Sequence, residues 1–247
     1  MDNYSLTGDV LLFTSDEKSR NWMMYEETNK IDHNIVQIVS IDDTKKYRDT
    51  GVFLPDSIYK GDILIRNPFE KNIYITAEEA SLEIRLSKFT LFSEVAQRLG
   101  ATHYKINEAT EVIEERKWSL DGKLNCRMVE SKINIKNEND LKNKMGILIE
   151  DDFPNNNVSI QEAEEFAEKY NLSQFTIIRS LIRQRGYENN RLEHRTLSID
   201  ASQEANKLLD AAFTLSALGG RFYIDPNLNS KLSKRETINL TVEYNFA

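Results

Sequence analysis

The stretch Ser87–Lys136, SKFTLFSEVAQRLGATHYKINEATEVIEERKWSLDGKLNCRMVESKINIK, predicts the centre of the fold. Its first part repeats apolar residues on one helical face, namely Phe89, Phe92, Val95, Ala96 and Leu99. Gly100 stands where a left-handed residue commonly ends such a helix. Two long strands follow, and we expect them to be joined at Asp121-Gly122.

The two strands are expected to pair as a hairpin. Gly122 suits the left-handed position of a three-residue turn with a bulge, which would pair Ser119 with Lys123. This register joins apolar residues and opposite charges across the hairpin, in the pairs Trp118–Leu124, Ile113–Val129 and Glu115–Arg127. The arms exceed the usual strand of about 5–6 residues, so we expect them to curve around a core, line a groove or reach a partner.

Composition narrows the class of protein. The chain has 247 residues, of which 40% are hydrophobic, and a net charge of −8, which excludes collagen-like and disordered chains. The acidic balance argues against a surface that coats nucleic acid or anionic lipid. A single cysteine, Cys126, cannot form an intramolecular disulfide, and no signal peptide is visible, so we expect a cytoplasmic protein. No apolar stretch reaches the roughly 20 residues of a transmembrane helix.

The first third of the chain is expected to be mostly β. Short apolar runs between turn residues predict strands at 9–14, 34–41, 51–54, 62–66 and 72–75. Residues 15–32 fit a helix or a packed loop, and the charged segment 42–50 is predicted to be a loop. Thr76 to Glu79 matches a helix capping box, after which 82–86 fits either a strand or a helix.

The second half is expected to begin after a linker at 137–158. Ser159 and Ser173 are predicted to cap two helices, which reach about Tyr170 and about Gln184. A strand at 191–199, a helix capped by Asp200 and strands at 221–224 and 237–246 follow. The sequences LGATHY at 99–104 and LGGRFY at 218–223 are similar, which suggests a duplicated β-α-β-β unit or a chance match.

Together these patterns predict an α+β fold, in which a mainly antiparallel sheet with long hairpins packs against about four helices. We expect a β-rich domain at 1–136, the linker at 137–158, and a helical pair with a β-α-β-β unit at 159–247, or one domain that combines them.

The helical pair resembles the spacing of a helix-turn-helix. Its second helix and the residues around it present side chains suited to bases or phosphates, namely Gln174, Thr176, Arg179, Arg183 and Arg185. Arg191 and Arg195 extend this basic tract. The first helix carries four glutamates that would repel phosphate, so an ordinary helical hairpin is the alternative interpretation.

Evidence for catalysis or a bound metal is weak. Glu130-Ser131-Lys132 fits the E-x-K of metal-dependent nucleases, but the nearest upstream acid, Asp121, falls in the expected turn. The three histidines, His33, His103 and His194, are far apart in sequence, and Cys126 is interpreted as a packed residue. We therefore predict no metal and no cofactor.

A pore-forming arm is a further interpretation of the hairpin, and it needs alternating apolar residues over about 10 positions per strand. Charged residues interrupt both faces, with Glu108, Glu114 and Arg116 on one and Glu111, Glu115 and Lys117 on the other. These charges count against a pore unless they face a lumen.

The leading hypothesis is a non-enzymatic protein that acts through contact with another protein or through self-assembly. It rests on the long strands and on a last strand whose alternating residues suit an edge. The candidate interaction residues are Trp118, Arg127, Tyr244 and Phe246. Nucleic-acid binding by the helical pair, a nuclease and a pore-forming protein are the alternatives, in that order.

Overall fold

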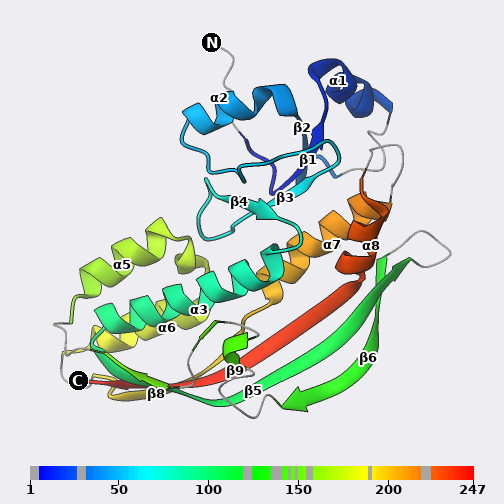
Figure 1. Cartoon of the computed structure of the whole chain (residues 1–247). Coiled ribbons are helices and arrows are strands. Elements are labelled where there is room, and N and C mark those ends of the chain that lie inside the picture. Colours follow the sequence, from blue (N-terminus) through cyan, green and yellow to red (C-terminus); the bar gives the residue numbers. More distant parts are fainter. Residues whose placement is uncertain are drawn as a thin grey trace. The chain divides into compact units, whose positions relative to one another are not determined.

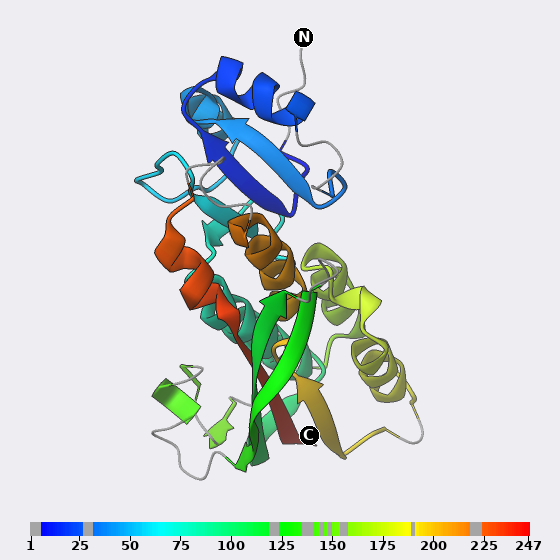
Figure 2. The same cartoon turned by 90° about the vertical axis from the view of Figure 1, so that its right-hand side faces the viewer.

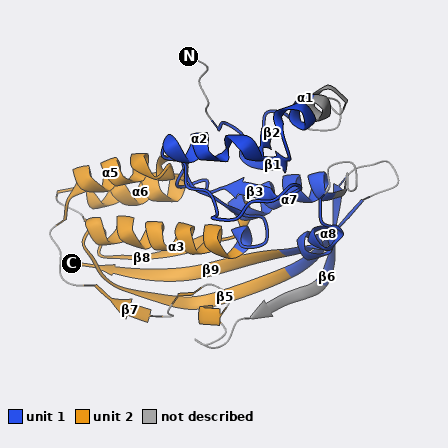
Figure 3. Cartoon of the chain, turned by 45° about the horizontal axis from the view of Figure 1, so that its top comes forward, with its two compact units in different colours: residues 1–81, 113–129, 204–235 blue, residues 82–112, 130–203, 236–247 orange. Residues whose placement is uncertain are grey.

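The computed structural model describes residues 6–26, 32–118, 124–134, 141–143, 146–147, 150–153, 158–188, 191–217 and 224–247. It has the predicted α+β class, with a mixed four-stranded sheet and a curled antiparallel five-stranded sheet (Figure 1). Residues 1–81, 113–129 and 204–235 form unit 1, and residues 82–112, 130–203 and 236–247 form unit 2 (Figure 3). The domain division around 137–158 stays a prediction.

The four-stranded sheet of unit 1 has the order β2-β1-β3-β4. Strands β1 (Val10–Thr14) and β2 (Val36–Ser40) are parallel, and β3 (Ile63–Arg66) is antiparallel to β1 and to β4 (Tyr74–Thr76). Helix α1 (Glu17–Glu26) is part of the chain segment that connects β1 to β2, because two parallel neighbouring strands need a long connection. The strand predictions at 9–14, 34–41, 62–66 and 72–75 are confirmed, with shifted ends.

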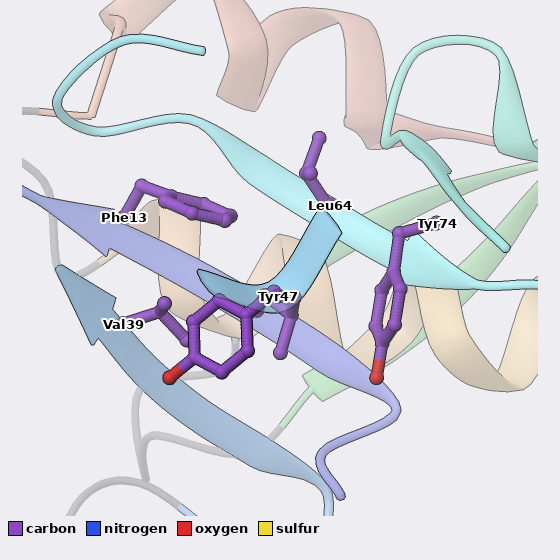
Figure 4. Packing of buried hydrophobic residues seen from close by; sticks show 6 residues of the cluster. Phe13, Val39, Tyr47, Leu64 and Tyr74 are labelled. Atoms are coloured by element: carbon purple, nitrogen blue, oxygen red, sulfur yellow. The ribbon is translucent and has the colours of Figure 1, made fainter. Parts of the chain in front are cut away.

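The core of unit 1 surrounds β1. It contains six buried residues from strands and a helix, namely Leu11, Phe13, Val39, Tyr47, Leu64 and Tyr74 (Figure 4). Tyr47 belongs to helix α2 (Thr44–Asp49), which follows the 3-10 helix η1 (Ile41–Asp43). The predicted loop at 42–50 is therefore wrong, because burial of one aromatic ring outweighs a charged local sequence. The strand predicted at 51–54 is reduced to one bridge, Phe53 with Ile73.

The five-stranded sheet has the order β6-β5-β9-β8, with β7 paired to β5. Its strands are β5 (Ala101–Trp118), β6 (Leu124–Asn134), β7 (Glu150–Asp152), β8 (His194–Asp200) and β9 (Lys234–Phe246). Strands β5 and β6 form the predicted long hairpin and lie side by side (Figures 1 and 2). Its turn and Gly122 lie outside the described residues, and the register stays a prediction.

The position of β9 corrects one expectation. The strand lies between β5 and β8, so the prediction that the last strand forms an edge is wrong. Its predicted alternation is nevertheless confirmed, because the residues of one face are all buried, namely Ile238, Leu240, Val242, Tyr244 and Phe246. Alternation indicates that one face is buried, but it does not indicate how many neighbours a strand has.

Helix α3 (Ala80–Arg98) packs on the sheet within unit 2 and settles the open question at 82–86 in favour of a helix. The ring of Phe89 meets that of Tyr104 edge-on at 5.5 Å, and Ser93 Oγ lies 3.1 Å from the Tyr244 hydroxyl. Gly100 has φ +85° after the last helical turn, as predicted. Its left-handed backbone lets β5 start directly after α3.

The helical pair consists of α5 (Ile160–Lys169) and α6 (Thr176–Arg185), joined by the 3-10 helix η2 (Leu172–Gln174). Ser159 caps α5 as predicted, since its Oγ accepts a hydrogen bond from the backbone N–H of Glu162 at 3.3 Å. The predicted cap at Ser173 is wrong, because α6 begins three residues later. Phe175 precedes α6 and packs against Phe92 at 5.3 Å, which fixes the start of the helix.

Helices α7 (Gln203–Ala217) and α8 (Pro226–Ser233) precede β9. The helix predicted after Asp200 is present as α7, but the predicted cap at Asp200 is wrong, because α7 begins three residues later and Asp200 accepts from the N–H of Ser202. Helix α8 does not appear among the predicted elements, although Asp225-Pro226 is a typical helix start. Of the strand predicted at 221–224, only Ile224 is described, and it is not in a strand. Residues 218–223, which carry the repeated sequence and most of this strand, lie outside the described residues, so the duplicated β-α-β-β unit stays a prediction.

Two tyrosines in the core of unit 2 predict loss of stability at alkaline pH. Burial, with a smaller effect of Asp151, raises the pKa of Tyr104 to about 12, and burial also raises the pKa of Tyr244. Because the unfolded chain ionises first, near the ordinary value of about 10, the free energy of unfolding should fall as pH rises from about 10 to 12.

Urea unfolding at several pH values tests this expectation. Tyr104→Phe should lose less stability than the parent over the alkaline range, because one of the tyrosines with a raised pKa is gone. Tyr59→Phe is the control, since Tyr59 is exposed and its removal should leave the pH dependence unchanged. Equal alkaline losses in the parent and in Tyr104→Phe would contradict the assignment.

Candidate interaction surface

A buried arginine fixes the end of β5 in unit 1. Arg116 donates from Nε to Asp210 Oδ1 at 2.6 Å and from Nη2 to Asn206 Oδ1 at 3.3 Å, both on α7. Its Nη1 donates to the carbonyl oxygens of Leu232 at 3.0 Å and Lys234 at 2.6 Å. One side chain therefore holds β5 against α7, the end of α8 and the start of β9.

Arg235 continues this polar cluster toward β6. Its Nη1 lies 3.1 Å from Cys126 Sγ, and its guanidinium is 3.5 Å from Glu114 and 3.7 Å from Asp210. Burial disfavours the charge, but the Cys126 thiol and the two carboxylates outweigh it and raise the pKa of Arg235. Cys126 is thus a packed residue that orients this part of β6 toward the cluster.

Strand β6 is an edge of its sheet. In the described part of the chain it pairs only with β5, so one row of its backbone N–H and C=O groups faces no strand. Since side chains alternate along a strand, Met128 shares the face of Cys126, and Arg127 and Val129 share the other face. Met128 is 61% exposed and Val129 59%, so apolar side chains are accessible on both faces.

Two predicted interaction residues lie at this end of the hairpin. Trp118 is 40% exposed and stacks on Phe213 of α7, with ring centroids 6.2 Å apart. Arg127 is exposed on β6. Met128 and Val129 were missed, because the expected hairpin register assigned Val129 an apolar partner and gave no sign that both faces of β6 are accessible.

The other two predicted interaction residues are in the core. Tyr244 and Phe246 are buried on β9, and their rings lie 6.5 Å apart. Their burial leaves no side-chain surface for a partner. An alternating apolar strand looks the same in sequence whether its apolar face meets a partner or the protein's own helices.

The predicted nucleic-acid residues are divided by the structure. Gln174, Thr176, Arg179 and Arg183 are exposed on the helical pair. Arg179 is engaged locally, since it donates to the carbonyl of Ser173 and to Thr176 Oγ1.

Arg185, in contrast, is buried in unit 2. It donates to the carbonyl oxygens of Leu99 at 2.8 Å, Leu192 at 2.6 Å and Ala247 at 2.8 Å. Burial, with a smaller effect of the neighbouring Arg191, lowers the pKa of this guanidinium. Arg185 thus joins the ends of three segments and is not accessible to a phosphate.

The nuclease alternative stays untested. Asp121 lies outside the described residues, as do the side chains of Glu130 and Lys132. His103 pairs with Asp152 at 2.9 Å and with Glu150 at 3.3 Å, and His194 pairs with Glu243 at 2.9 Å. No group of three or more histidine, cysteine or acidic side chains among the described residues is arranged to hold a metal ion.

Comparison of the chain with family models, with curated proteins and with solved structures finds no match. Within the described residues, no helix is both long enough and apolar enough to cross a membrane. The case for a function therefore rests on the surfaces of this chain alone.

The Arg116 cluster predicts a large loss of stability on mutation. Arg116→Met should lower the free energy of unfolding by about 3 kcal/mol or more, because Asp210 and two carbonyl oxygens lose their donor. Denaturant unfolding measures this loss. Arg179→Met on the surface is the control and should cost at most about 1 kcal/mol.

The double variant Arg116→Met with Asp210→Leu separates the two causes. It should recover part of the loss, because the carboxylate that has lost the short hydrogen bond from Arg116, and keeps only the longer contact of 3.7 Å with Arg235, is also removed. A loss below about 1 kcal/mol in Arg116→Met would show that the cluster does not hold this part of unit 1 together.

Proposed function

We propose that this protein is a non-enzymatic assembly protein whose copies associate by pairing β6 with β6. The observation that carries the proposal is the edge position of β6 together with the exposure of Met128 and Val129. Such an edge can add a strand through backbone hydrogen bonds, and exposed apolar side chains then gain burial. The single cysteine agrees with the reducing cytoplasm expected from the sequence.

A second copy is favoured as the partner because the sequence of β6 is complementary to itself. Two copies related by a two-fold axis pair antiparallel, and residues directly opposite each other must share a face of the sheet. The axis therefore passes through a residue position. Axes at Arg127, Glu130 or Lys132 would place like charges opposite each other, which is unfavourable.

Of the remaining central positions, Ser131 alone pairs opposite charges. An axis there places Glu130 across from Lys132 and Val129 across from Ile133, each pair twice by symmetry. Each such pair is worth roughly 0.2–1 kcal/mol relative to alanines, in addition to the backbone hydrogen bonds. Axes at Cys126, Met128 or Val129 form no pair of opposite charges.

Cysteine cross-linking tests both the assembly and its register. In a Cys126→Ser background, Ser131→Cys should form an intermolecular disulfide under mild oxidation, because two β-carbons opposite each other lie about 4.5–5.5 Å apart. Asn125→Cys is the matched control on the same strand and the same face, and it should not cross-link, since this register places it far from its own copy.

Native mass spectrometry of the unmodified protein accompanies the cross-linking. A defined dimer in the parent that becomes a monomer in Val129→Lys would support pairing through β6. A monomer at all concentrations, or cross-linking of Asn125→Cys in place of Ser131→Cys, would contradict the proposal. Detection of a different bound protein in place of a second copy would also contradict self-pairing.

A further inference from the structure

An open cavity of about 590 Å³ lies in unit 2, where the chain passes from the end of α6 to the start of β8. Its described lining residues are Gln184, Tyr187, Arg191, Leu192, Glu193 and Arg195. Volumes of about 300–1,000 Å³ are typical of small-molecule sites. The lining offers two guanidinium groups, one aromatic ring, one amide and one aliphatic side chain.

The arginines of this cavity lack partners within the described part of the chain. Neither Arg191 nor Arg195 makes a side-chain hydrogen bond or ion pair there, whereas Arg179 and Arg185 are both engaged. Glu193 is the one acidic residue on the described lining. Because the chain has a net charge of −8, we would expect its surface arginines to form ion pairs with carboxylates.

Two charged residues of the cavity lining also act on the buried Arg185. The charge of Arg191 adds to burial in lowering the pKa of Arg185, while Glu193 acts in the opposite direction. The carbonyl oxygens of Ile182 and Arg183 at the end of α6 already accept from the N–H of Gly186. The cavity arginines are therefore not used to satisfy these two carbonyl groups.

The aromatic residue defines the class of ligand. Tyr187 is 52% exposed at the cavity, so its ring is accessible to a flat partner. Arginines bind phosphate through two parallel hydrogen bonds, and aromatic rings stack on nucleic-acid bases irrespective of sequence. Gln184 supplies an amide that can donate to and accept from a base.

We infer that this cavity binds a nucleotide, with its phosphate on Arg191 and Arg195 and its base on Tyr187. The nucleotide is either free in solution or one unit of a single-stranded nucleic acid, since both offer the same base and phosphate. This site uses residues of unit 2 other than those of β6, so it does not depend on the proposed assembly.

Titration calorimetry on the full chain tests the inference with four probes, which are AMP, adenosine, inorganic phosphate and a single-stranded oligothymidine. AMP binding would identify a free nucleotide as the ligand. Binding of the oligonucleotide alone, with an affinity that falls steeply with salt, would identify a strand. Absence of binding by AMP and by the oligonucleotide at millimolar concentration would overturn the inference.

Three variants locate the bound groups. Arg191→Gln and Arg195→Gln should each weaken binding by about tenfold or more, because a charged hydrogen-bond donor to phosphate is lost. Tyr187→Ala should weaken AMP binding and leave phosphate binding unchanged. Arg179→Gln is the control, since Arg179 is an exposed arginine that does not line the cavity.

Circular dichroism of each variant excludes unfolding as the cause of a loss. Equal affinities of the parent and of Arg191→Gln and Arg195→Gln would overturn the inference, even if AMP binds. Equal effects of Arg179→Gln and Arg191→Gln would do the same, because they would indicate general attraction of anions.

Discussion

The structure depends on two buried arginines that collect carbonyl oxygens. Arg116 binds carbonyl oxygens of Leu232 and Lys234 in unit 1, and Arg185 binds those of Leu99, Leu192 and Ala247 in unit 2. A guanidinium has five donors and no acceptor, so it can be buried only where several acceptors converge. Each arginine therefore determines where helices and strands of its unit end.

This constraint also explains which predictions from the sequence succeeded. Predictions that depend on patterns of a few neighbouring residues are confirmed. Examples are the Ser159 cap, the left-handed backbone of Gly100 and the alternation of β9. The α+β class followed from such signals. Features that depend on distant partners were not predictable, because the acceptors of Arg116 are at least 90 residues away in sequence.

The candidate sites also depend on residues that are distant in sequence, and they could therefore not be predicted. Arg185 resembles its neighbours Arg179 and Arg183 in sequence, but it is buried and donates to three carbonyl groups, of which those of Leu99 and Ala247 are distant in sequence. The alternating residues of β9 predicted an edge strand, but β9 lies inside the sheet and β6 lies at an edge. The basic tract was noticed in the sequence, but the cavity that brings Arg191 and Arg195 together with Tyr187 depends on the fold.

Both proposed binding surfaces, strand β6 and the cavity beside α6, use side chains other than the two buried arginines. The central claim is that β6 pairs with a second copy, and the most direct measurement is hydrogen exchange of backbone amides at low and high protein concentration. We predict that exchange in Leu124–Asn134 slows as concentration rises, while exchange in β8, which ends the strand order on the opposite side from β6, stays the same. Exchange in β6 that does not depend on concentration would contradict the account.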